Sequence, residues 1–357
     1  MRIRLAWLGF LILLASAATH TPASANCTLP YQLTNGTTAD ASQVMGDLNT
    51  IIGCLGSTAA GFVNKFRNGT MDVWQRSTSG TATTTAGATT QTGADGWYIV
   101  PAGASVAWAQ ATGRGPTVFS LKVTGASSVT DVVVKQRIES YVAAPLSGQT
   151  VTVQAEVFNS TGSAIVPTLT VKHAGSADNW SSPTTDVNAV SLQSIANGSW
   201  TQVAYTFTAS TSSVNGLEIS FDFLNNFGAG SQSIQITELD IRGTPGVATG
   251  INNGPPPPEL RPVFVELSFC QRYYWQTTST FNPVGYGGGN YFTYVSFPAT
   301  MRAAPTAANF SYGDSSNVSS SSVYATSISN MTIIMTAGSS AVAYEIIAAG
   351  ITLTAEL

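Results

Sequence analysis

The sequence predicts an all-β protein with a jelly-roll β-sandwich, a smaller C-terminal β domain and a short N-terminal helical segment. Apolar residues alternate with polar ones through most of residues 65–246, which is the period of strands with one buried face. Clusters of Gly, Ser and Asn separate these runs and favour turns. Charged residues make up only 9% of the chain, so hydroxyl and amide groups must solvate its surface, as is typical of extracellular β-proteins.

The N-terminus has the pattern of a secretory signal. Arg2 and Arg4 precede an apolar run from Leu5 to Ala18, and small residues follow it. This pattern predicts a signal peptide over residues 1–25, cleaved before Asn26. The apolar run of about 14 residues is shorter than the ~20 that a membrane-spanning helix needs. We therefore expect a secreted or extracellular mature chain with no membrane span.

The charge balance argues against a nucleic-acid partner. Of 14 basic residues, Arg2 and Arg4 leave with the signal peptide, so the mature chain has 12 basic and 18 acidic residues and a formal net charge of −6. Binding to a phosphate backbone requires a clustered basic face. No such cluster occurs in the sequence.

Three cysteines belong to the mature chain. In an exported protein, Cys27 and Cys54 are expected to form a disulfide around the first mature segment, stabilising it by about 3 kcal/mol. Cys270 is then unpaired and is expected to be a buried, unreactive thiol. The sequence contains no CxxC or HxxxH spacing, which argues against a redox centre or a zinc site.

The composition divides the mature chain into four segments. Residues 26–64 form an N-terminal helical neck, because apolar residues recur there at helical spacing after the N-cap candidates Thr38 and Asp40. The sandwich occupies residues 65–246, a Gly/Pro linker residues 247–262, and the C-terminal β domain residues 263–357. The apolar positions of the helix are Ala41, Val44, Leu48, Ile51, Ile52 and Leu55.

The last strand of the sandwich has a fault in its alternation, in the stretch "SIQITELDIR". Ile234 and Ile236 share one face, whereas Leu239 and Ile241 share the other unless one extra residue is absorbed near residues 237–238. A β-bulge at that point returns both pairs to the core. The sequence therefore predicts a bulge, which also redirects the side chain at position 238.

Catalytic motifs are missing, so we expect a protein that is not an enzyme. His173 is the only histidine of the mature chain, and no GxSxG, HExxH, Walker or dinucleotide motif occurs. Paired carboxylates are the alternative, since a glycoside hydrolase needs only two. Asp95, Glu238 and Asp240 are also candidate ligands for structural calcium, and no other cofactor is expected. The carboxylates considered for catalysis are Asp72, Asp95, Asp178, Asp222, Glu218, Glu238 and Asp240.

Two loops are candidates for glycan binding, because aromatic rings stack on sugars while amides and carboxylates bond to their hydroxyls. Asp178, Asn179 and Trp180 lie in the polar stretch "SADNWSSP", where Trp180 has little to bury against. A loop anchor is the alternative reading of this tryptophan. Tyr286 and Tyr291 flank a Gly-rich loop in "NPVGYGGGNYFTY", which suits contact with a partner.

The stretch "FCQRYYWQ" follows the linker and combines a cysteine, an arginine and three consecutive aromatic residues. We expect it to be a strand, whose residues alternate between two faces. Phe269, Tyr273 and Trp275 would then belong to a core or an inter-chain seam, and Arg272 and Tyr274 would face the other way.

Several motifs in order resemble bacteriophage and prophage tail-fibre or tail-tip proteins. They include "NGTMDVWQRSTSG", "ADGWYI", "FSLKVTGASS", "LSGQTVTVQAEVF", "FCQRYYWQ" and "FPATMRAAPT". In that family a jelly roll similar to carbohydrate-binding modules precedes a small C-terminal β domain. The resemblance implies a homo-oligomer, with a trimer as one form, that contacts glycans on a bacterial surface as a virion component.

The export signal departs from the phage pattern, because phage tail proteins assemble in the cytoplasm. It favours a secreted or surface protein of a cell. We therefore expect a non-enzymatic adhesin of tail-fibre type whose partner is a cell-surface polysaccharide. The alternatives are a polysaccharide depolymerase acting through paired carboxylates and a purely structural fibre subunit.

Overall fold

The computed structural model describes residues 40–46, 62–84, 91–277, 280–338, 342–347 and 350–357. The chain divides into two compact units, residues 1–61 and residues 62–357. The first unit contributes a helix over residues 41–46, and Asp40 caps it by accepting a hydrogen bond from the Ser42 N–H at 2.8 Å. The rest of the expected neck helix and the expected Cys27–Cys54 disulfide lie outside the described residues. Within the described ranges no helix is long and apolar enough to span a bilayer.

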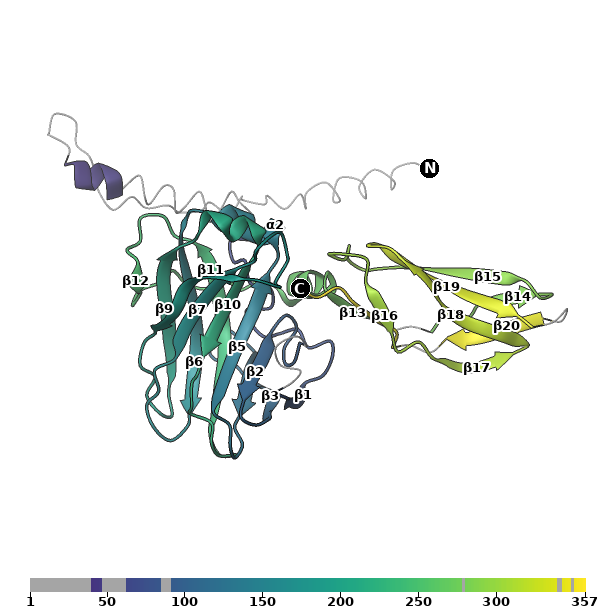
Figure 1. Ribbon diagram of the computed structural model, residues 1–357, viewed down its shortest axis with the longest axis horizontal. Helices are drawn as coiled ribbons and strands as arrows, with labels where there is room; N and C mark the ends of the chain where they lie inside the picture. The colour runs from purple at the N-terminus through teal and green to yellow at the C-terminus, as the bar shows by residue number, and fades with distance from the viewer. Residues whose placement is uncertain (1–39, 47–61, 85–90, 278–279, 339–341, 348–349) are drawn as a thin grey trace, which may run out of the picture. The chain divides into compact units, whose positions relative to one another are not determined.

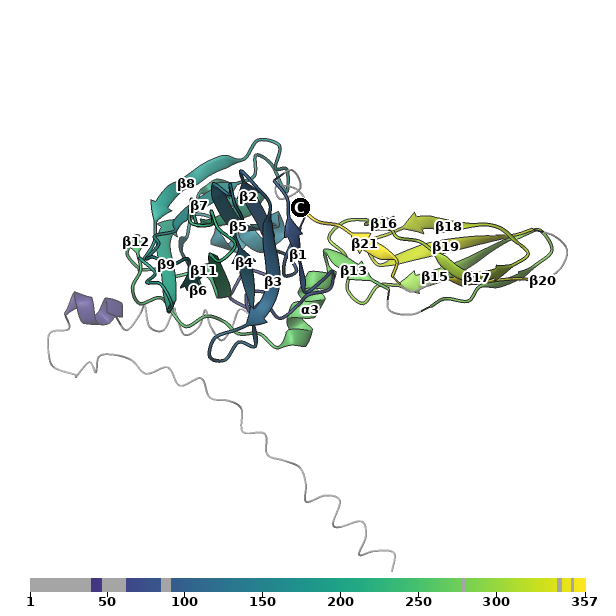
Figure 2. The same ribbon diagram turned by 90° about the horizontal axis from the view of Figure 1, so that it is seen from below.

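Two antiparallel sheets packed face to face form the sandwich (Figures 1 and 2), so the predicted jelly-roll architecture is confirmed. The seven-stranded sheet has the order β1 (Ser79–Ala82), β3 (Val106–Thr112), β4 (Phe119–Thr124), β11 (Ser233–Gly243), β6 (Thr150–Ser160), β9 (Trp200–Thr208) and β12 (Gly250–Ile251). The five-stranded sheet has the order β2 (Tyr98–Ala102), β5 (Asp131–Ile138), β10 (Leu217–Asp222), β7 (Thr168–His173) and β8 (Thr184–Ser191).

Alternation along the strands builds the core between the two sheets. Val151 and Val153 of β6 and Ile219 and Phe221 of β10 all belong to this core, and all four are buried. Trp97 is fully buried and donates its indole N–H to the Asn68 carbonyl at 3.1 Å, which satisfies its one polar atom. The large apolar cluster of the sandwich is therefore built from the inward-facing residues, which the alternation of apolar and polar residues along each strand predicts.

The β-bulge in β11 is confirmed. The register of β11 against β6 shifts between Thr237 and Asp240, and Glu238 has a φ of 52°. The shift leaves both Leu239 and Ile241 buried. Gly69 lies against the bulge, because a Cβ atom at Gly69 would come within 2.2 Å of the Leu239 carbonyl oxygen.

The expected linker, residues 247–262, is held along the seven-stranded sheet. The Asn252 N–H donates to the Ala204 carbonyl at 3.0 Å, and the Gln154 amide donates to the Pro256 carbonyl at 2.7 Å. Gln154 points away from the core, yet it is only 1% exposed. This segment therefore covers part of the polar face of β6, β9 and β11 and forms hydrogen bonds with the buried side chains of Gln154, Thr206 and Asp240.

Arg261 fastens the end of that segment to the start of the sandwich. Its guanidinium donates to the Asn64 and Phe66 carbonyls at 2.6 and 2.9 Å and pairs with Glu266 at 3.0 Å. Glu266 in turn accepts a hydrogen bond from the Asn68 N–H at 2.7 Å. Both members of the pair are buried, and helix α3 (Val263–Gln271) is thereby positioned against the strands.

A smaller C-terminal β domain follows α3, as predicted, and consists of three antiparallel sheets (Figure 2). Val295, Met331, Ile333, Ile347 and Leu353 form much of its core. The sheets are β13 (Tyr274–Gln276), β21 (Thr352–Thr354) and β16 (Thr306–Ala308); β14 (Val284–Tyr286), β20 (Val342–Ile347) and β17 (Tyr312–Ser316); and β15 (Asn290–Ser296), β19 (Asn330–Ala337) and β18 (Val318–Thr326).

The expectation of a continuous strand through "FCQRYYWQ" is wrong. Helix α3 continues to Gln271, and the strand β13 begins only at Tyr274, so the alternation does not apply across the join. Tyr273 and Tyr274 are both buried, each beneath an arginine guanidinium 3.8 Å from its ring centroid. Cys270 is a buried free thiol whose pKa is raised by burial, in agreement with the expected unreactive role.

Substitution of Gly69 tests the packing at the bulge. Gly69→Ala should lower the free energy of unfolding by about 2 kcal/mol or more, because a backbone carbonyl must move to admit the methyl group. Gly228→Ala is the matched control, since a Cβ atom there meets nothing within 4 Å. Urea unfolding of both variants measures the difference, and equal stabilities would contradict the packing at Leu239.

Candidate functional site

The outer face of the five-stranded sheet carries a groove of about 210 Å³, here called the sheet-face groove. Strand register places its side chains in rows across β5, β10 and β7, and Val100 of β2 adds an apolar edge. The rows are Arg137–Glu218–Lys172, Lys135–Ser220–Thr170 and Val133–Asp222–Thr168. The groove thus offers ammonium, hydroxyl and carboxylate groups over a partly apolar floor.

Glu218 organises the basic end of the groove. Its buried carboxylate accepts hydrogen bonds from Lys135 Nζ at 3.0 Å and Arg137 Nε at 2.8 Å. Burial opposes its ionisation, but the two cations and their hydrogen bonds outweigh that effect and lower the pKa of Glu218. Glu218 is therefore ionised at neutral pH and holds both cations in place. Lys172 lies opposite it on β7, and the Lys172 ammonium has no hydrogen-bond or ion-pair partner among the residues that the structure describes.

Two carboxyl groups lie at the other end. Asp222 is directly opposite Val133, which makes Asp131, two residues earlier on β5, its diagonal neighbour on the same face. Burial, together with the hydrogen bond to Asp222 and its charge, raises the pKa of Asp131 to about 6. At mildly acidic pH Asp131 therefore holds a proton beside the Asp222 carboxyl group.

Trp180 stands beside the basic end. The Arg137 guanidinium lies 4.9 Å from the centroid of its ring, and the ring edge packs near Gly216. The side chain is half-buried, and its indole N–H has no hydrogen-bond partner in the described part of the chain. Trp180, one of the predicted ligand residues, is thus linked to the groove through Arg137.

Its two neighbours shape the loop. Asp178 accepts a hydrogen bond from the Ser140 N–H at 2.7 Å and lies 3.6 Å from the Arg302 guanidinium. Asn179 is exposed, and its side-chain oxygen accepts the Ser181 N–H at 3.1 Å. Asp178 therefore anchors the loop. The sequence had offered this role as the alternative for Trp180.

Tyr286 and Tyr291 belong to the C-terminal domain. The Tyr291 hydroxyl donates to the Tyr286 carbonyl, and its ring covers Gly285, where a Cβ atom would meet it at 2.2 Å. Tyr291 therefore stabilises its own hairpin. The Tyr286 side chain is 62% exposed and shares an exposed sheet face with Val342 and Tyr344. No contact among the described residues joins these tyrosines to the sheet-face groove.

The three candidate calcium ligands are not brought together. Asp95 accepts the Gln75 N–H at 3.1 Å and lies 3.7 Å from Arg76. Asp240 pairs with Arg242 and accepts the Glu259 N–H at 2.8 Å. Glu238 accepts a hydrogen bond from the Thr117 hydroxyl at 3.4 Å. Within the described ranges no group of three or more His, Cys, Asp or Glu residues is arranged to hold a metal ion.

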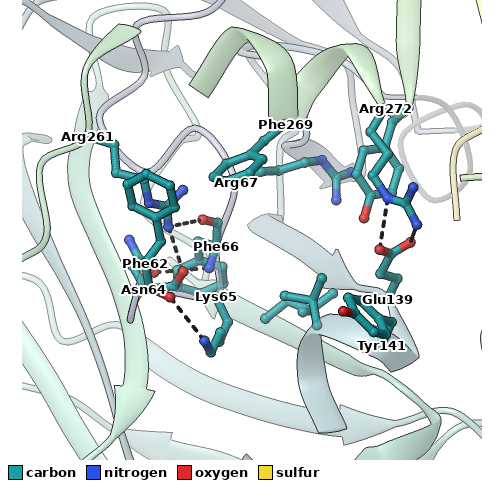
Figure 3. A pocket seen from close by; sticks show the side chains of 13 residues that line it. Phe62, Asn64, Lys65, Phe66, Arg67, Glu139, Tyr141, Arg261, Phe269 and Arg272 are labelled. Atoms are coloured by element: carbon teal, nitrogen blue, oxygen red, sulfur yellow. Dashed lines mark hydrogen bonds and ion pairs between the residues drawn. The ribbon is translucent and has the colours of Figure 1, made fainter. Parts of the chain in front are cut away.

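A larger cavity of about 460 Å³ lies where α2 (Ser140–Ala143), α3 and residues 62–67 meet (Figure 3). Its walls are mostly aromatic and aliphatic, with Phe62, Phe269 and Tyr141 among them. Arg272 at its edge pairs with Glu139 at 3.0 Å, as the dashed lines in Figure 3 show. The charged groups here are thus largely engaged in joining α3 to the sandwich.

Comparisons with known proteins leave the family open. No family model matches the sequence, and no curated protein matches it. Among solved structures, the enzymatically active domain of bacteriophage CBA120 tailspike protein 4 matches 51% of this chain and 21% of that chain, at 10% identity and a TM-score of 0.34. The CBM22-1 and GH10 modules of a Clostridium thermocellum endo-1,4-β-D-xylanase match 44% of this chain and 28% of that chain, at 11% identity and a TM-score of 0.31.

A third structure, the CBM22-2 xylan-binding domain from Paenibacillus barcinonensis, matches 46% of this chain and 99% of its own length, at 14% identity and a TM-score of 0.32. This chain therefore spans less than a third of the tailspike and xylanase chains that it matches. TM-scores this low carry no argument about function. The properties of the groove rest on its own residues.

Sequence reasoning missed most of the groove. It considered Glu218 and Asp222 only as members of a list of carboxylates, and it overlooked Asp131, Lys135 and Lys172. A signal was present in "DVVVKQRIE", where residues 131, 135 and 137 are charged and fall on one face of a strand. Only the pairing of β5 with β10 shows that these charges meet Glu218 and Asp222.

The raised pKa of Asp131 predicts a pH-dependent stability. The proton that Asp131 holds stabilises the fold fully below its ordinary value of 3.8, and that contribution is lost as the pH rises through about 6. Asp131→Asn should therefore gain stability relative to the wild type between pH 4.5 and pH 7.5. The expected difference in Tm is a few °C at pH 7.5, and it should shrink toward pH 4.5.

Thermal unfolding at the two pH values measures this difference. Asp222→Asn is the companion variant; it should weaken the pH dependence only in part, because burial, the largest cause, still raises the pKa of Asp131. Parallel stability curves for the wild type and Asp131→Asn would contradict the raised pKa of Asp131.

Proposed function

We propose that this chain is a non-enzymatic glycan-binding protein and that the sheet-face groove holds the glycan. The observation that carries the proposal is the convergence of hydroxyl, ammonium and carboxylate groups in a partly buried groove on the open face of the sandwich. Beside its basic end, the aromatic ring of Trp180 lies 4.9 Å from the Arg137 guanidinium. The export signal, the homo-oligomer and the tail-fibre role remain predictions from the sequence.

Each part of the groove suits a sugar. Ser220 and Thr170 present hydroxyl groups that both donate and accept hydrogen bonds, as sugar hydroxyls do. Glu218 fixes the Lys135 ammonium, so this donor is oriented before a ligand arrives and less entropy is lost on binding. Val100 and Val133 offer apolar contact to the C–H faces of sugar rings.

The length of the groove suits a chain of sugars. Glu218 and Asp222 are the outermost lining residues on β10 and lie four residues apart, which corresponds to about 13 Å along a strand. A single monosaccharide would occupy only part of that length. We therefore propose an oligosaccharide segment of a polysaccharide as the ligand.

Single substitutions test this location against the C-terminal loop. Ser220→Ala and Trp180→Ala should each weaken binding to a recognised glycan about tenfold, the effect of losing roughly 1.4 kcal/mol of contact. Tyr286→Ala should leave the affinity unchanged, since Tyr286 has no contact with the groove. A glycan array identifies the ligand, and isothermal titration calorimetry measures the affinities. Loss of binding in Tyr286→Ala alone would move the site to the C-terminal domain.

A second candidate function is a polysaccharide depolymerase, favoured by one observation. Asp131 has a pKa raised to about 6 beside a second carboxyl group, and a glycosidase needs one protonated and one ionised carboxyl group. On this alternative the wild type releases reducing ends from a bound polysaccharide, and both Asp131→Asn and Asp222→Asn reduce the rate at least a hundredfold. Binding without any release of reducing ends would exclude it.

A further inference from the structure

We propose that the glycan is acidic, and that Lys172 binds a carboxylate or sulfate group carried by it. This inference rests on the proposed function of the groove and adds the chemical class of its ligand. It follows from how the three cations of the groove, Lys135, Arg137 and Lys172, are engaged.

Two of these cations already have partners. Glu218 accepts hydrogen bonds from Lys135 and from Arg137, and a second nitrogen of Arg137 donates to the Leu357 carbonyl at 3.1 Å. Lys172 of β7 lies directly opposite Glu218 of β10, yet its side-chain ammonium forms no hydrogen bond or ion pair with any described residue. It is half-buried at the wall of the groove. Lys172 is therefore the cation that remains free to bind an incoming anion.

The surroundings of Lys172 suit an anionic group on a sugar. Thr170 precedes it by two residues on the same face of β7, and Ser220 is directly opposite Thr170. When an anionic group binds the Lys172 ammonium, the hydroxyl groups of Thr170 and Ser220 lie in the next row of side chains. They can form hydrogen bonds with neighbouring hydroxyl groups of the sugar. A charge-assisted hydrogen bond is roughly twice as strong as a neutral one, so this contact would dominate recognition.

The other end of the groove fixes the direction of the ligand. Asp222 is opposite Thr168, which lies four residues from Lys172 and therefore about 13 Å along β7. Together with Asp131, Asp222 makes that end negative, so an anionic substituent is repelled there. The charge distribution favours the acidic group beside Lys172.

Matched polymers separate acidic from neutral ligands. The full mature chain is titrated with polygalacturonate and its methyl ester, and with dextran sulfate and dextran. We expect at least one acidic polymer to bind ten times or more tightly than its neutral counterpart, with an affinity that falls as salt is added. Lys172→Gln should remove that preference. Lys122→Gln is the control, because Lys122 lies on β4 of the other sheet and also lacks a partner among the described residues.

The outcomes separate the two proposals. Equal affinity for the acidic and neutral forms, or an unchanged preference in Lys172→Gln, overturns the inference while leaving glycan binding in place. A preference lost equally in Lys122→Gln also overturns it, because overall charge would then explain the effect. If no polymer or array glycan binds, or Ser220→Ala and Trp180→Ala bind as the wild type does, the groove function itself is overturned. Equal melting temperatures of both lysine variants and the wild type exclude unfolding as the cause.

Discussion

The hydrogen bonds that hold residues 247–262 along the seven-stranded sheet determine which face of the sandwich remains available. Gln154, Asn252 and Arg261 are the main donors in this attachment, and the buried side chains of Thr206 and Asp240 also form hydrogen bonds with the segment. Such groups would otherwise require water, because burying an unpaired amide costs about 1–3 kcal/mol. With part of this face covered by its own chain, the open face of the five-stranded sheet provides the groove, where the Lys172 ammonium is available to a ligand.

The groove gains its chemistry from charges that are fixed by strand pairing. Glu218 is buried and ionised because Lys135 and Arg137 compensate its charge, and the same pairing immobilises both cations. Asp131 lacks such a cation and is protonated more readily. Two carboxyl groups on one sheet face thus have pKa values shifted in opposite directions, because only Glu218 has cationic neighbours. This contrast gives the groove a basic and an acidic end, which is the basis for proposing an oriented, acidic ligand.

Much of the fold could be predicted from the sequence. The period of two marked the inward residues of β6 and β10, and the fault at residues 237–238 located the bulge, because both features depend only on neighbouring residues of one strand. The strand expected at Phe269–Gln276 was wrong, since an apolar and aromatic stretch fits a short helix as well as a strand. The ion pair between Arg261 and Glu266 favours the helix at this point of the chain, because both residues also form hydrogen bonds with residues 64–68.

For the site, the sequence by itself identified Trp180 as an unusual loop residue and listed Glu218 and Asp222 among seven carboxylates. It could not single out Asp131, Lys135 or Lys172, because their significance arises from pairing between strands that are far apart in the chain. Lys172 and Glu218 are 46 residues apart by their numbers and directly opposite in the sheet. Local alternation determined which way each side chain points, whereas the tertiary order of β5, β10 and β7 decided which charges meet, since Coulomb interactions depend on distance in space.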